Sequence, residues 1–481
     1  MAKFEELNVQ YSMINIQFSM KRVAISFYFS LLTFNFFGQT VTQKLQKAFT
    51  AFEKDSQLKH AISSLYVIDV NTGQVVFDKN SQVGLAPAST QKIITSVTAF
   101  ELLGKDYRYK TEFGNRKDNG NTLFINPSGD PTFCSWRWRE TSKDSIINKL
   151  FKSLDGNNIT RIRNVVIDTT GWDYENIPDG WIWQDIGNYY GAGAHKFNYY
   201  ENQYDISFRS GNSVGDSVGI ISTKLGNQRW LESKLTSAKK GSGDNAYVYL
   251  PDYPTEKFII RGTIPINEDS FSISASITDP EWIFFYSIAY RLQEEKQFDA
   301  GHGDLTLLGS SFLKDRNFNV IYTHYSPTLD SIIYWLNKKS VNLYAEALIK
   351  TFAYEKNGFG STDSGVVIVQ NFWKGKGMDE DELGIVDGSG LSPLNRVTTH
   401  SQVEILKYAK TKDWFPYFYN SLPEYNGMIM KSGTIRGVKG FCGYHKAKNS
   451  KEYIFSFLVN NYNGSSSALV NKMYKVLDIL K

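Results

Sequence analysis

Ser89 and Lys92 have the residue types and the spacing for nucleophilic chemistry in this 481-residue sequence. Pro87 precedes them and apolar residues follow at helical spacing, so the pattern predicts that a helix begins here and carries both side chains on one face. A serine hydroxyl attacks well only beside a base, and an amine becomes that base when burial lowers its pKa. Taken alone, the tetrad Ser-x-x-Lys fits the solvated start of a helix better than it fits a catalytic site. The same tetrad recurs at residues 237–240 and 311–314, where no long apolar periodicity follows it.

Two short motifs far downstream supply further hydroxyl, amide and ammonium groups. Ser340-Val341-Asn342 lies at the junction of two predicted helices, and Lys431-Ser432-Gly433 begins a predicted strand. Neither motif is specific alone, and Ser-x-Asn recurs at Ser210-Gly211-Asn212. The three motifs in this order, each in a fitting context, form the set found in penicillin-interacting serine enzymes and predict acyl transfer by a serine nucleophile.

The elements that must position these groups lie near both ends of the chain. Helices, hairpins and strands are predicted at 40–55, 60–79, 89–104, 282–295, 329–337, 342–356, 363–373, 427–444, 453–460 and 467–480. Residues 107–280 contain short β-like runs and many turns instead. We therefore expect an α+β fold in which residues 39–105 and 281–481 form the catalytic domain and residues 106–280 form a β-rich insertion.

The composition limits the classes of function. A net charge of +4 gives no reason to expect nucleic-acid binding, and an apolar content of 41% suits a folded soluble protein. The six histidines form no pair at zinc-ligand spacing, so we expect no catalytic metal, and no cofactor is implied. Cys134 and Cys442 are far apart in sequence; a disulfide between them stays open, but two buried thiols is the favoured interpretation.

The first 38 residues have the features of a leader for export. Met20-Lys21-Arg22 precedes an apolar run from Val23 to Phe37, and Gly38 is a small residue at its end. This order is typical of a signal peptide that starts at Met20 and is cleaved after Gly38. The run is short for a transmembrane helix, and an uncleaved anchor is the alternative. We expect the mature chain to be secreted across the inner membrane into the periplasm.

With these motifs the chain resembles the class C low-molecular-mass penicillin-binding proteins, the serine D-Ala-D-Ala carboxypeptidase/endopeptidase family. The resemblance runs from about residue 45 to the C-terminus and includes Gly129-Asp130-Pro131-Thr132, Arg261-Gly262-Thr263-Ile264-Pro265, Thr278-Asp279-Pro280 and Asp387-Gly388-Ser389-Gly390-Leu391-Ser392. It implies a penicillin-binding, transpeptidase-like core, in which helices flank an antiparallel sheet, with extra domains inserted after the Ser-x-x-Lys helix. It also implies a D,D-peptidase that acts on peptidoglycan stem peptides and is covalently inhibited by β-lactams.

The resemblance assigns catalytic roles to five residues. Ser89 would attack the carbonyl carbon of a D-Ala-D-Ala bond and form an acyl-enzyme, with Lys92 as the base. Ser340 would relay the proton to the leaving amine, and Asn342 would hold the substrate amide and orient Lys92. Lys431 would place positive charge near the free carboxylate of the substrate and help to keep Lys92 neutral. Water would then release the acyl group.

The substrate-binding residues that the resemblance implies are Ser432, Gly433, Thr434, Asp185 and Tyr190. Ser432 and Thr434 would offer hydroxyl groups to the substrate carboxylate, and the backbone N–H groups of Ser89 and Thr434 would form the oxyanion hole. Asp185 and Tyr190 lie in the insertion, where Asp185 would bind the amino group of a diaminopimelate-type side chain. A packed aromatic cluster is the alternative interpretation of that stretch.

Two departures from the family pattern bear on specificity. The third motif is Lys-Ser-Gly where Lys-Thr-Gly is commoner, which keeps the hydroxyl, and Pro393 stands where some members carry a basic residue that helps to bind substrate.

Two other hypotheses stay open. A β-lactamase or esterase of the same fold would differ by fast deacylation, and a catalytically inactive wall-binding protein would lack one of the three catalytic side chains Ser89, Lys92 and Lys431, all of which are present.

Overall fold

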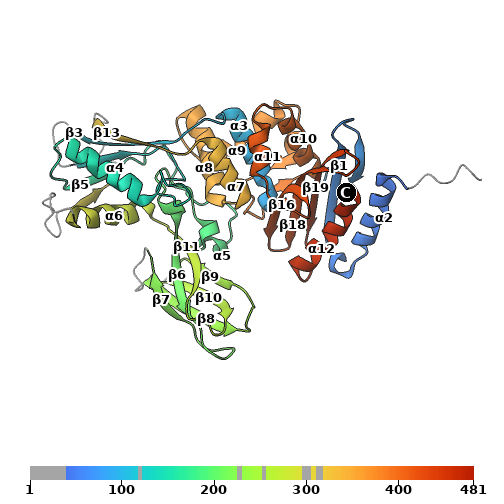
Figure 1. Ribbon diagram of the computed structural model, residues 1–481, viewed down its shortest axis with the longest axis horizontal. Coiled ribbons are helices and arrows are strands. Elements are labelled where there is room, and N and C mark those ends of the chain that lie inside the picture. Colours follow the sequence, from blue (N-terminus) through green and yellow to red (C-terminus); the bar gives the residue numbers. More distant parts are fainter. Residues whose placement is uncertain (1–38, 117–121, 225–229, 252–255, 295–304, 310–317) are drawn as a thin grey trace, which may run out of the picture.

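The computed structural model describes residues 39–116, 122–224, 230–251, 256–294, 305–309 and 318–481. Its centre is a six-stranded antiparallel sheet, whose strands run in the spatial order β16 (Glu424–Tyr425), β17 (Met428–Ile435), β18 (Val438–Lys446), β19 (Glu452–Asn460), β1 (Ile62–Asp69) and β2 (Val75–Lys79). The N-terminal hairpin therefore pairs with the last strand of the chain, as Figure 1 shows on the right. The expected α+β fold with an antiparallel sheet is confirmed.

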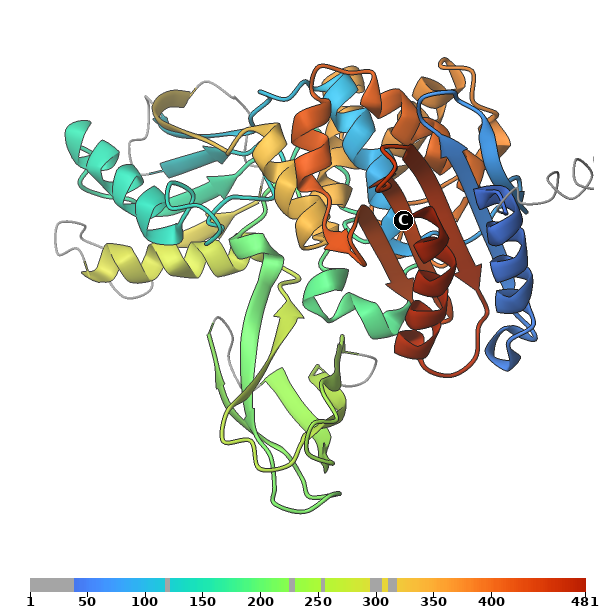
Figure 2. The same cartoon turned by 45° about the vertical axis from the view of Figure 1, so that its right-hand side comes forward.

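Helices cover both faces of this sheet. Helices α2 (Val41–Glu53) and α12 (Ser466–Leu477) lie on one face (Figure 2), where they pack against Leu65, Val67 and Phe457. On the other face lie α3 (Lys92–Leu102), α7 (Leu329–Lys338), α8 (Asn342–Asn357), α9 (Thr362–Lys374), α10 (Thr399–Lys410) and α11 (Phe415–Ser421). Because successive side chains of a strand point to opposite faces, Tyr66 and Ile68 join this second layer.

Helix α3 differs from the surface helix that its periodicity suggests. Every residue from Lys92 to Phe100 is buried, because α3 packs against α7, α8, α9 and α10. A helix that is apolar on most sides lies inside a domain. The hydrophilic residues of its first turns therefore have partners within the protein instead of water.

The first part of the insertion is a five-stranded sheet in the order β12 (Thr306–Leu308), β5 (Asn164–Ile167), β4 (Thr122–Asn126), β3 (Lys110–Arg116) and β13 (Phe318–Tyr325). Helices α4 (Lys143–Gly156) and α6 (Pro280–Glu294) pack against it through Leu150, Phe151 and Phe284. We expected the catalytic domain to resume at residue 281, but β13 pairs with β3 along its length, so the chain returns to the catalytic core just before α7. The insertion is also more helical than expected, because α4 and α6 belong to it.

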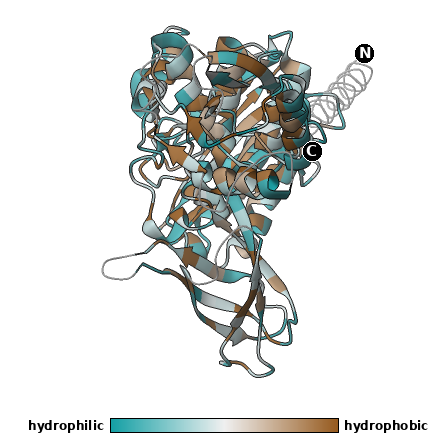
Figure 3. Cartoon of the chain, turned by 90° about the vertical axis from the view of Figure 1, so that its left-hand side faces the viewer, coloured by the Kyte–Doolittle hydropathy of each residue, from teal (hydrophilic) through white to brown (hydrophobic). Residues whose placement is uncertain are grey.

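The second part of the insertion projects from the rest of the molecule, at the bottom of Figures 1 and 3. It consists of two three-stranded sheets, β8 (Leu231–Ala238)–β10 (Phe258–Pro265)–β9 (Asn245–Tyr249) and β11 (Phe271–Ser276)–β6 (Gln203–Arg209)–β7 (Gly219–Thr223). The sheets share one core that includes Phe208, Val248 and Ile260. The short helix α5 (Trp183–Ile186) contacts β9 and the 3₁₀ turn η3 (Tyr189–Gly191), and η3 in turn contacts α8 of the catalytic core.

The predicted leader, residues 1–38, lies outside the described residues. Among the residues that are described, no helix combines the length and the apolar character needed to cross a membrane. Cys134 and Cys442 are both buried with free thiols, so the favoured interpretation of the two cysteines is confirmed.

Candidate active site

Ser89 and Lys92 lie at the start of the buried helix, as their spacing predicts, but not in one continuous α-helix. Ser89 belongs to a 3₁₀ turn, η2 (Ala88–Gln91), and Lys92 is the first residue of α3. Side chains three residues apart eclipse each other in a 3₁₀ turn, and Lys92 Nζ donates a hydrogen bond to Ser89 Oγ at 3.0 Å. Ala88 has a φ of 47°, in the left-handed region, and this turn sets the direction of the Ser89 side chain.

The Lys92 amine is completely buried and held by three oxygen atoms. Besides Ser89 Oγ, Nζ donates to Asn342 Oδ1 at 2.6 Å and to the carbonyl oxygen of Ser389 at 2.8 Å. Burial lowers the pKa of Lys92 to about 7, although the carboxylates of Glu346 and Asp387 act in the opposite direction. A neutral amine is therefore accessible at ordinary pH, which a base next to Ser89 requires.

Ser340 and Lys431 form a second hydrogen-bonded pair beside the first. Lys431 Nζ donates to Ser340 Oγ at 3.0 Å and to the carbonyl oxygen of Ser432 at 3.0 Å. Burial lowers the pKa of Lys431 well below its usual value, and the charge of Lys92 adds to this lowering. Ser340 has a φ of 57°, and this left-handed residue between α7 and α8 turns the chain so that its hydroxyl meets Lys431.

Strand β17 lies directly against the turn that carries Ser89, and a glycine allows this. A Cβ atom on Gly433 would lie 2.6 Å from the carbonyl oxygen of Pro87 and 2.9 Å from the backbone nitrogen of Ser89. The next residue, Thr434, is exposed in the pocket, and its Oγ1 accepts a hydrogen bond from Lys439 Nζ at 2.8 Å. Close contact of strand and turn thus brings the backbone of Thr434 near that of Ser89.

Two buried carboxylates that we had given no role hold the loop behind Lys92. Glu346 accepts hydrogen bonds from the backbone N–H groups of Gly388 (2.9 Å) and Ser389 (2.8 Å). Asp387 accepts from Gly390 N (2.8 Å), Ser392 N (2.7 Å), Gln91 Nε2 (3.0 Å), Asn395 Nδ2 (2.9 Å) and Trp181 Nε1 (3.0 Å). Burial and the nearby Asp387 carboxylate raise the pKa of Glu346. These contacts fix the Ser389 carbonyl that receives the Lys92 amine.

The position of Glu346 could have been noticed in the sequence. Glu346 follows Asn342 by four residues in α8, so both side chains lie on one face of the helix. Asp387, Gly388 and Ser389 belong to a stretch that the resemblance includes. Their contacts with Glu346 and Gln91, however, join residues that are more than 40 positions apart in sequence.

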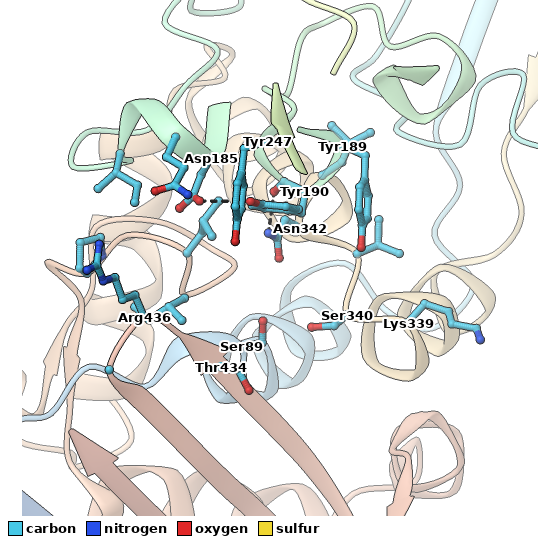
Figure 4. A pocket seen from close by; sticks show the side chains of 18 of the residues that line it. Ser89, Asp185, Tyr189, Tyr190, Tyr247, Lys339, Ser340, Asn342, Thr434 and Arg436 are labelled. Carbon is cyan, nitrogen blue, oxygen red and sulfur yellow. Dashed lines mark hydrogen bonds between the residues drawn. The ribbon is translucent and has the colours of Figure 1, made fainter. Parts of the chain in front are cut away.

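These groups lie beside a pocket of about 1100 Å³ between the catalytic core and the insertion. Figure 4 shows Ser89, Ser340 and Thr434 on one side and Asp185, Tyr190 and Tyr247 on the other. Asn342 connects the two sides, because its Nδ2 donates to the carbonyl oxygen of Tyr190 at 2.6 Å. The insertion therefore forms one wall of the pocket.

Of the ten residues predicted for the site, six line the pocket and the others lie behind it. The lining residues are Ser89, Ser340, Asn342, Thr434, Asp185 and Tyr190. Lys92, Lys431 and Gly433 are buried behind this surface, and Ser432 is half-buried beside them. Tyr190 OH donates to Asp185 Oδ1 at 3.3 Å, and burial raises the pKa of Asp185. The sequence did not point to Arg436, Lys339 or Tyr189, which also line the pocket.

The fold and this arrangement agree with comparisons to known proteins. The crystal structure of penicillin binding protein 4 (dacB) from Haemophilus influenzae aligns with a TM-score of 0.74 at 18% identity, covering 92% of this chain and 99% of that one. The same protein, complexed with a novel β-lactam, aligns with a TM-score of 0.68 over 91% of this chain and 99% of that one, also at 18% identity. The chain thus has the penicillin-binding fold.

The sequence comparisons define the family. The D-Ala-D-Ala carboxypeptidase 3 (S13) family matches residues 45–424, and the chain belongs to this family of serine peptidases. A D-alanyl-D-alanine carboxypeptidase of Actinomadura sp. (strain R39) is 25% identical over 463 residues, 89% of this chain and 83% of that protein. The D-alanyl-D-alanine carboxypeptidase DacB of Haemophilus influenzae is 22% identical over 421 residues, 82% of this chain and 84% of that protein. The family predicted from the motifs is confirmed.

Proposed function

We propose that this protein hydrolyses D-Ala-D-Ala peptide bonds of peptidoglycan stem peptides through an acyl-enzyme on Ser89. The observation that carries the proposal is the paired arrangement at the pocket, in which Lys92 Nζ binds Ser89 Oγ and Lys431 Nζ binds Ser340 Oγ, each at 3.0 Å. Family membership and the names of the curated relatives support the substrate.

Acylation begins when neutral Lys92 removes the proton from Ser89. The Ser89 oxygen forms a bond with the carbonyl carbon, and the carbonyl oxygen becomes an oxyanion that the backbone N–H groups of Ser89 and Thr434 stabilise. Such a donor typically contributes about 2.7–4 kcal/mol to the lowering of the barrier. Asn342 keeps the amine of Lys92 in place throughout, through its 2.6 Å contact with Nζ.

Release of the amine needs a proton at the leaving nitrogen. Ser340 donates it and recovers a proton from Lys431, while the bond between the carbonyl carbon and the leaving nitrogen breaks. A substrate carboxylate beside Lys431, Ser432 and Thr434 favours the charged form of Lys431, whose pKa burial otherwise lowers. Before deacylation Lys92 loses the proton that it took from Ser89, and Lys431 regains the proton that it gave up. Neutral Lys92 then takes a proton from the water that attacks the acyl carbon, and returns it to Ser89 Oγ as the bond between the acyl carbon and that oxygen breaks.

Asp185 and Tyr190 would contact the side chain of the stem peptide. The two form a hydrogen-bonded pair on the pocket wall, and a carboxylate at this place attracts an amino group. A diaminopimelate-type side chain offers such an amine. Arg436 and Pro393 also line the pocket, where Arg436 brings a positive charge and Pro393 brings none.

We also infer export to the periplasm and covalent inhibition by β-lactams. The apolar run at residues 23–37 supports export, and the β-lactam complex of the Haemophilus influenzae relative supports inhibition. Both inferences agree with a substrate that lies outside the inner membrane.

The first experiment is covalent labelling of purified residues 39–481 with a fluorescent penicillin, with Ser89→Ala as the matched control. A stable band on the wild type that is absent from the variant would identify Ser89 as the nucleophile and establish slow deacylation. Release of D-alanine from a pentapeptide ending in D-Ala-D-Ala would complete the assignment.

Two other outcomes would replace the proposal. Rapid loss of the reagent without a stable band would indicate a β-lactamase. The absence of both a labelled band and turnover of the reagent would indicate a wall-binding protein without catalytic activity.

A further inference from the structure

We propose that Lys439 positions the hydroxyl group of Thr434 to bind the free carboxylate of the substrate. This inference rests on the proposed function and adds a positioning residue to the Ser89 site. Lys439 is buried and lies outside the three sequence motifs, so neither the pattern of the sequence nor the surface of the pocket points to it.

The pairing of two strands places Lys439 beside Thr434. Thr434 is the last residue but one of β17, Lys439 is the second residue of β18, and the antiparallel register pairs the two directly. Side chains of directly opposite residues lie on the same face of a sheet. Lys439 Nζ therefore reaches Thr434 Oγ1 and donates a hydrogen bond to it at 2.8 Å.

The ammonium group of Lys439 is a buried charge for which the described residues provide no carboxylate. Lys439 is 8% exposed, and within the described ranges its one hydrogen bond goes to Thr434. The centre of the Phe441 ring lies 4.7 Å from Nζ and compensates the charge in part. Burial lowers the pKa of Lys439 to about 8, because a charge without a partner is costly in a buried place. Such an ammonium group is stabilised when an anion binds beside it.

A second buried ammonium group lies close to the first. Besides burial and the charge of Lys92, the charge of Lys439 lowers the pKa of Lys431, so these ammonium groups repel one another. Lys431 also lacks a carboxylate partner in the part of the chain that is described, where its bonds go to neutral oxygen atoms. The surroundings of Ser432 and Thr434 are therefore positive and favour a negatively charged ligand.

The hydrogen bond from Lys439 orients the Thr434 hydroxyl. A threonine hydroxyl has one hydrogen and two acceptor lone pairs. Since Thr434 Oγ1 accepts from the ammonium group of Lys439, its own hydrogen points elsewhere, and Thr434 lines the pocket beside Ser89 (Figure 4). A carboxylate only accepts hydrogen bonds, so it binds this hydroxyl through that hydrogen. The nearby positive charge also polarises the O–H group and strengthens the bond that it donates.

The free carboxylate of a D-Ala-D-Ala substrate meets this hydroxyl for geometric reasons. The carboxylate is attached to the carbon atom next to the scissile nitrogen, so it stays close to the carbonyl carbon that Ser89 attacks. Strand β17 lies against the Ser89 turn, and Thr434 follows the glycine that permits this contact. Without Lys439 the hydroxyl would rotate freely and would also present its lone pairs to the carboxylate, which repel it.

The test compares two D-alanyl thioesters on purified residues 39–481. The first has a leaving group whose carboxylate stands where the C-terminal carboxylate of D-Ala would be, and the second is its methyl ester. A thioester is reactive enough for the cleavage of both to be measured. The measured quantity is the ratio of kcat/KM for the acid to kcat/KM for the ester. Because both substrates are measured on one sample, a loss of folded protein cancels in this ratio.

Lys439→Met keeps an unbranched side chain of similar length but removes its charge and its donor. This variant should lower the ratio about 10- to 100-fold, the range that a hydrogen bond to a charged group contributes. Lys439→Arg keeps the charge and a donor and should retain most of the ratio. Lys446→Met, at the other end of β18, is the matched control, because Lys446 is exposed and forms an ion pair with Glu452 at 3.9 Å. It should leave the ratio unchanged.

Thr434→Val tests whether Lys439 acts through the hydroxyl. The double variant with Lys439→Met should lose less than the two single losses multiplied together, because each substitution removes the same contact. An unchanged ratio in Lys439→Met, an equal loss in Lys439→Arg or in Lys446→Met, or losses that multiply in the double variant would overturn the inference. A wild type that cleaves acid and ester at the same rate would also overturn it. A wild type that neither binds penicillin nor cleaves either thioester would instead refute the proposed function.

Discussion

Replacement of Gly433 by alanine tests whether the contact of β17 with the Ser89 turn places the oxyanion-hole donors. The new Cβ atom would lie 2.6 Å from Pro87 O, 2.8 Å from Thr90 N and 2.9 Å from Ser89 N. All three are backbone atoms, so no side chain can move aside to relieve the contacts. The strand and the turn must separate.

The size of that separation gives the expected effect. An ordinary contact of a Cβ atom is 3.4–4 Å, so the strand and turn must move apart by roughly 1 Å. A backbone N–H displaced by about 1 Å from its acceptor no longer makes a good hydrogen bond. Loss of one oxyanion donor raises a barrier by about 2.7–4 kcal/mol, so we expect acylation by Gly433→Ala to be about 100- to 1000-fold slower.

The assay is the second-order rate constant for acylation by a fluorescent penicillin, with the thermal midpoint Tm measured on the same samples. Gly440→Ala is the matched control, because Gly440 is the residue paired with Gly433 across β17 and β18. Its Cβ would meet the end of the Leu458 side chain at 2.5 Å and Pro87 O at 3.5 Å. Since Leu458 can adopt another rotamer, Gly440→Ala should acylate within about tenfold of the wild type even where its Tm falls.

Two results would refute this reasoning. Acylation of Gly433→Ala at the wild-type rate would mean that the strand and turn can separate without moving the donors. Equal slowing in both variants would mean that a general disturbance of the hairpin, and not the position of the Ser89 and Thr434 backbone, controls the rate.

Buried titratable groups give three further expected outcomes. Because neutral Lys92 is the base and its pKa is about 7, the acylation rate should rise with pH around a midpoint near 7 between pH 5 and 9; a flat profile would exclude this role. Glu346→Gln leaves one backbone N–H of Gly388 or Ser389 without its acceptor. This change should lower the free energy of unfolding, measured by thermal or urea unfolding, by about 1–3 kcal/mol. Burial raises the pKa of Asp130 to about 6, so ionisation of this carboxyl destabilises the folded chain as the pH rises. We expect Asp130→Asn to raise the free energy of unfolding by about 3 kcal/mol at pH 8 and by roughly half of that at pH 5. An equal increase at both pH values would contradict this reasoning.

Much of the catalytic core could be predicted because its signals are local. Thr40 caps α2 through a capping box with Gln43, and the nearly continuous apolar runs of β1 and β19 are typical of strands that are covered on both faces. The end of the insertion was misplaced for the opposite reason. The helical pattern of α6 is also local, but whether α6 belongs to the core depends on the pairing of β13 with β3, about 200 residues earlier in the chain.

The sequence by itself determined which groups could do chemistry: the serine and lysine of the tetrad, the Ser-x-Asn motif and the Lys-Ser-Gly motif, each recognisable within a few residues. Only the tertiary structure decided what surrounds them. The pKa of Lys92 is lowered because its amine is buried, and Asn342 and Ser389, 250 and 297 residues away in sequence, fix the position of that amine. The tertiary structure also decided that Asp185, from the insertion, and Lys339, from the core, line one pocket, because the insertion folds back over the core. Desolvation and charge depend on neighbours in space, and a linear pattern does not contain those neighbours.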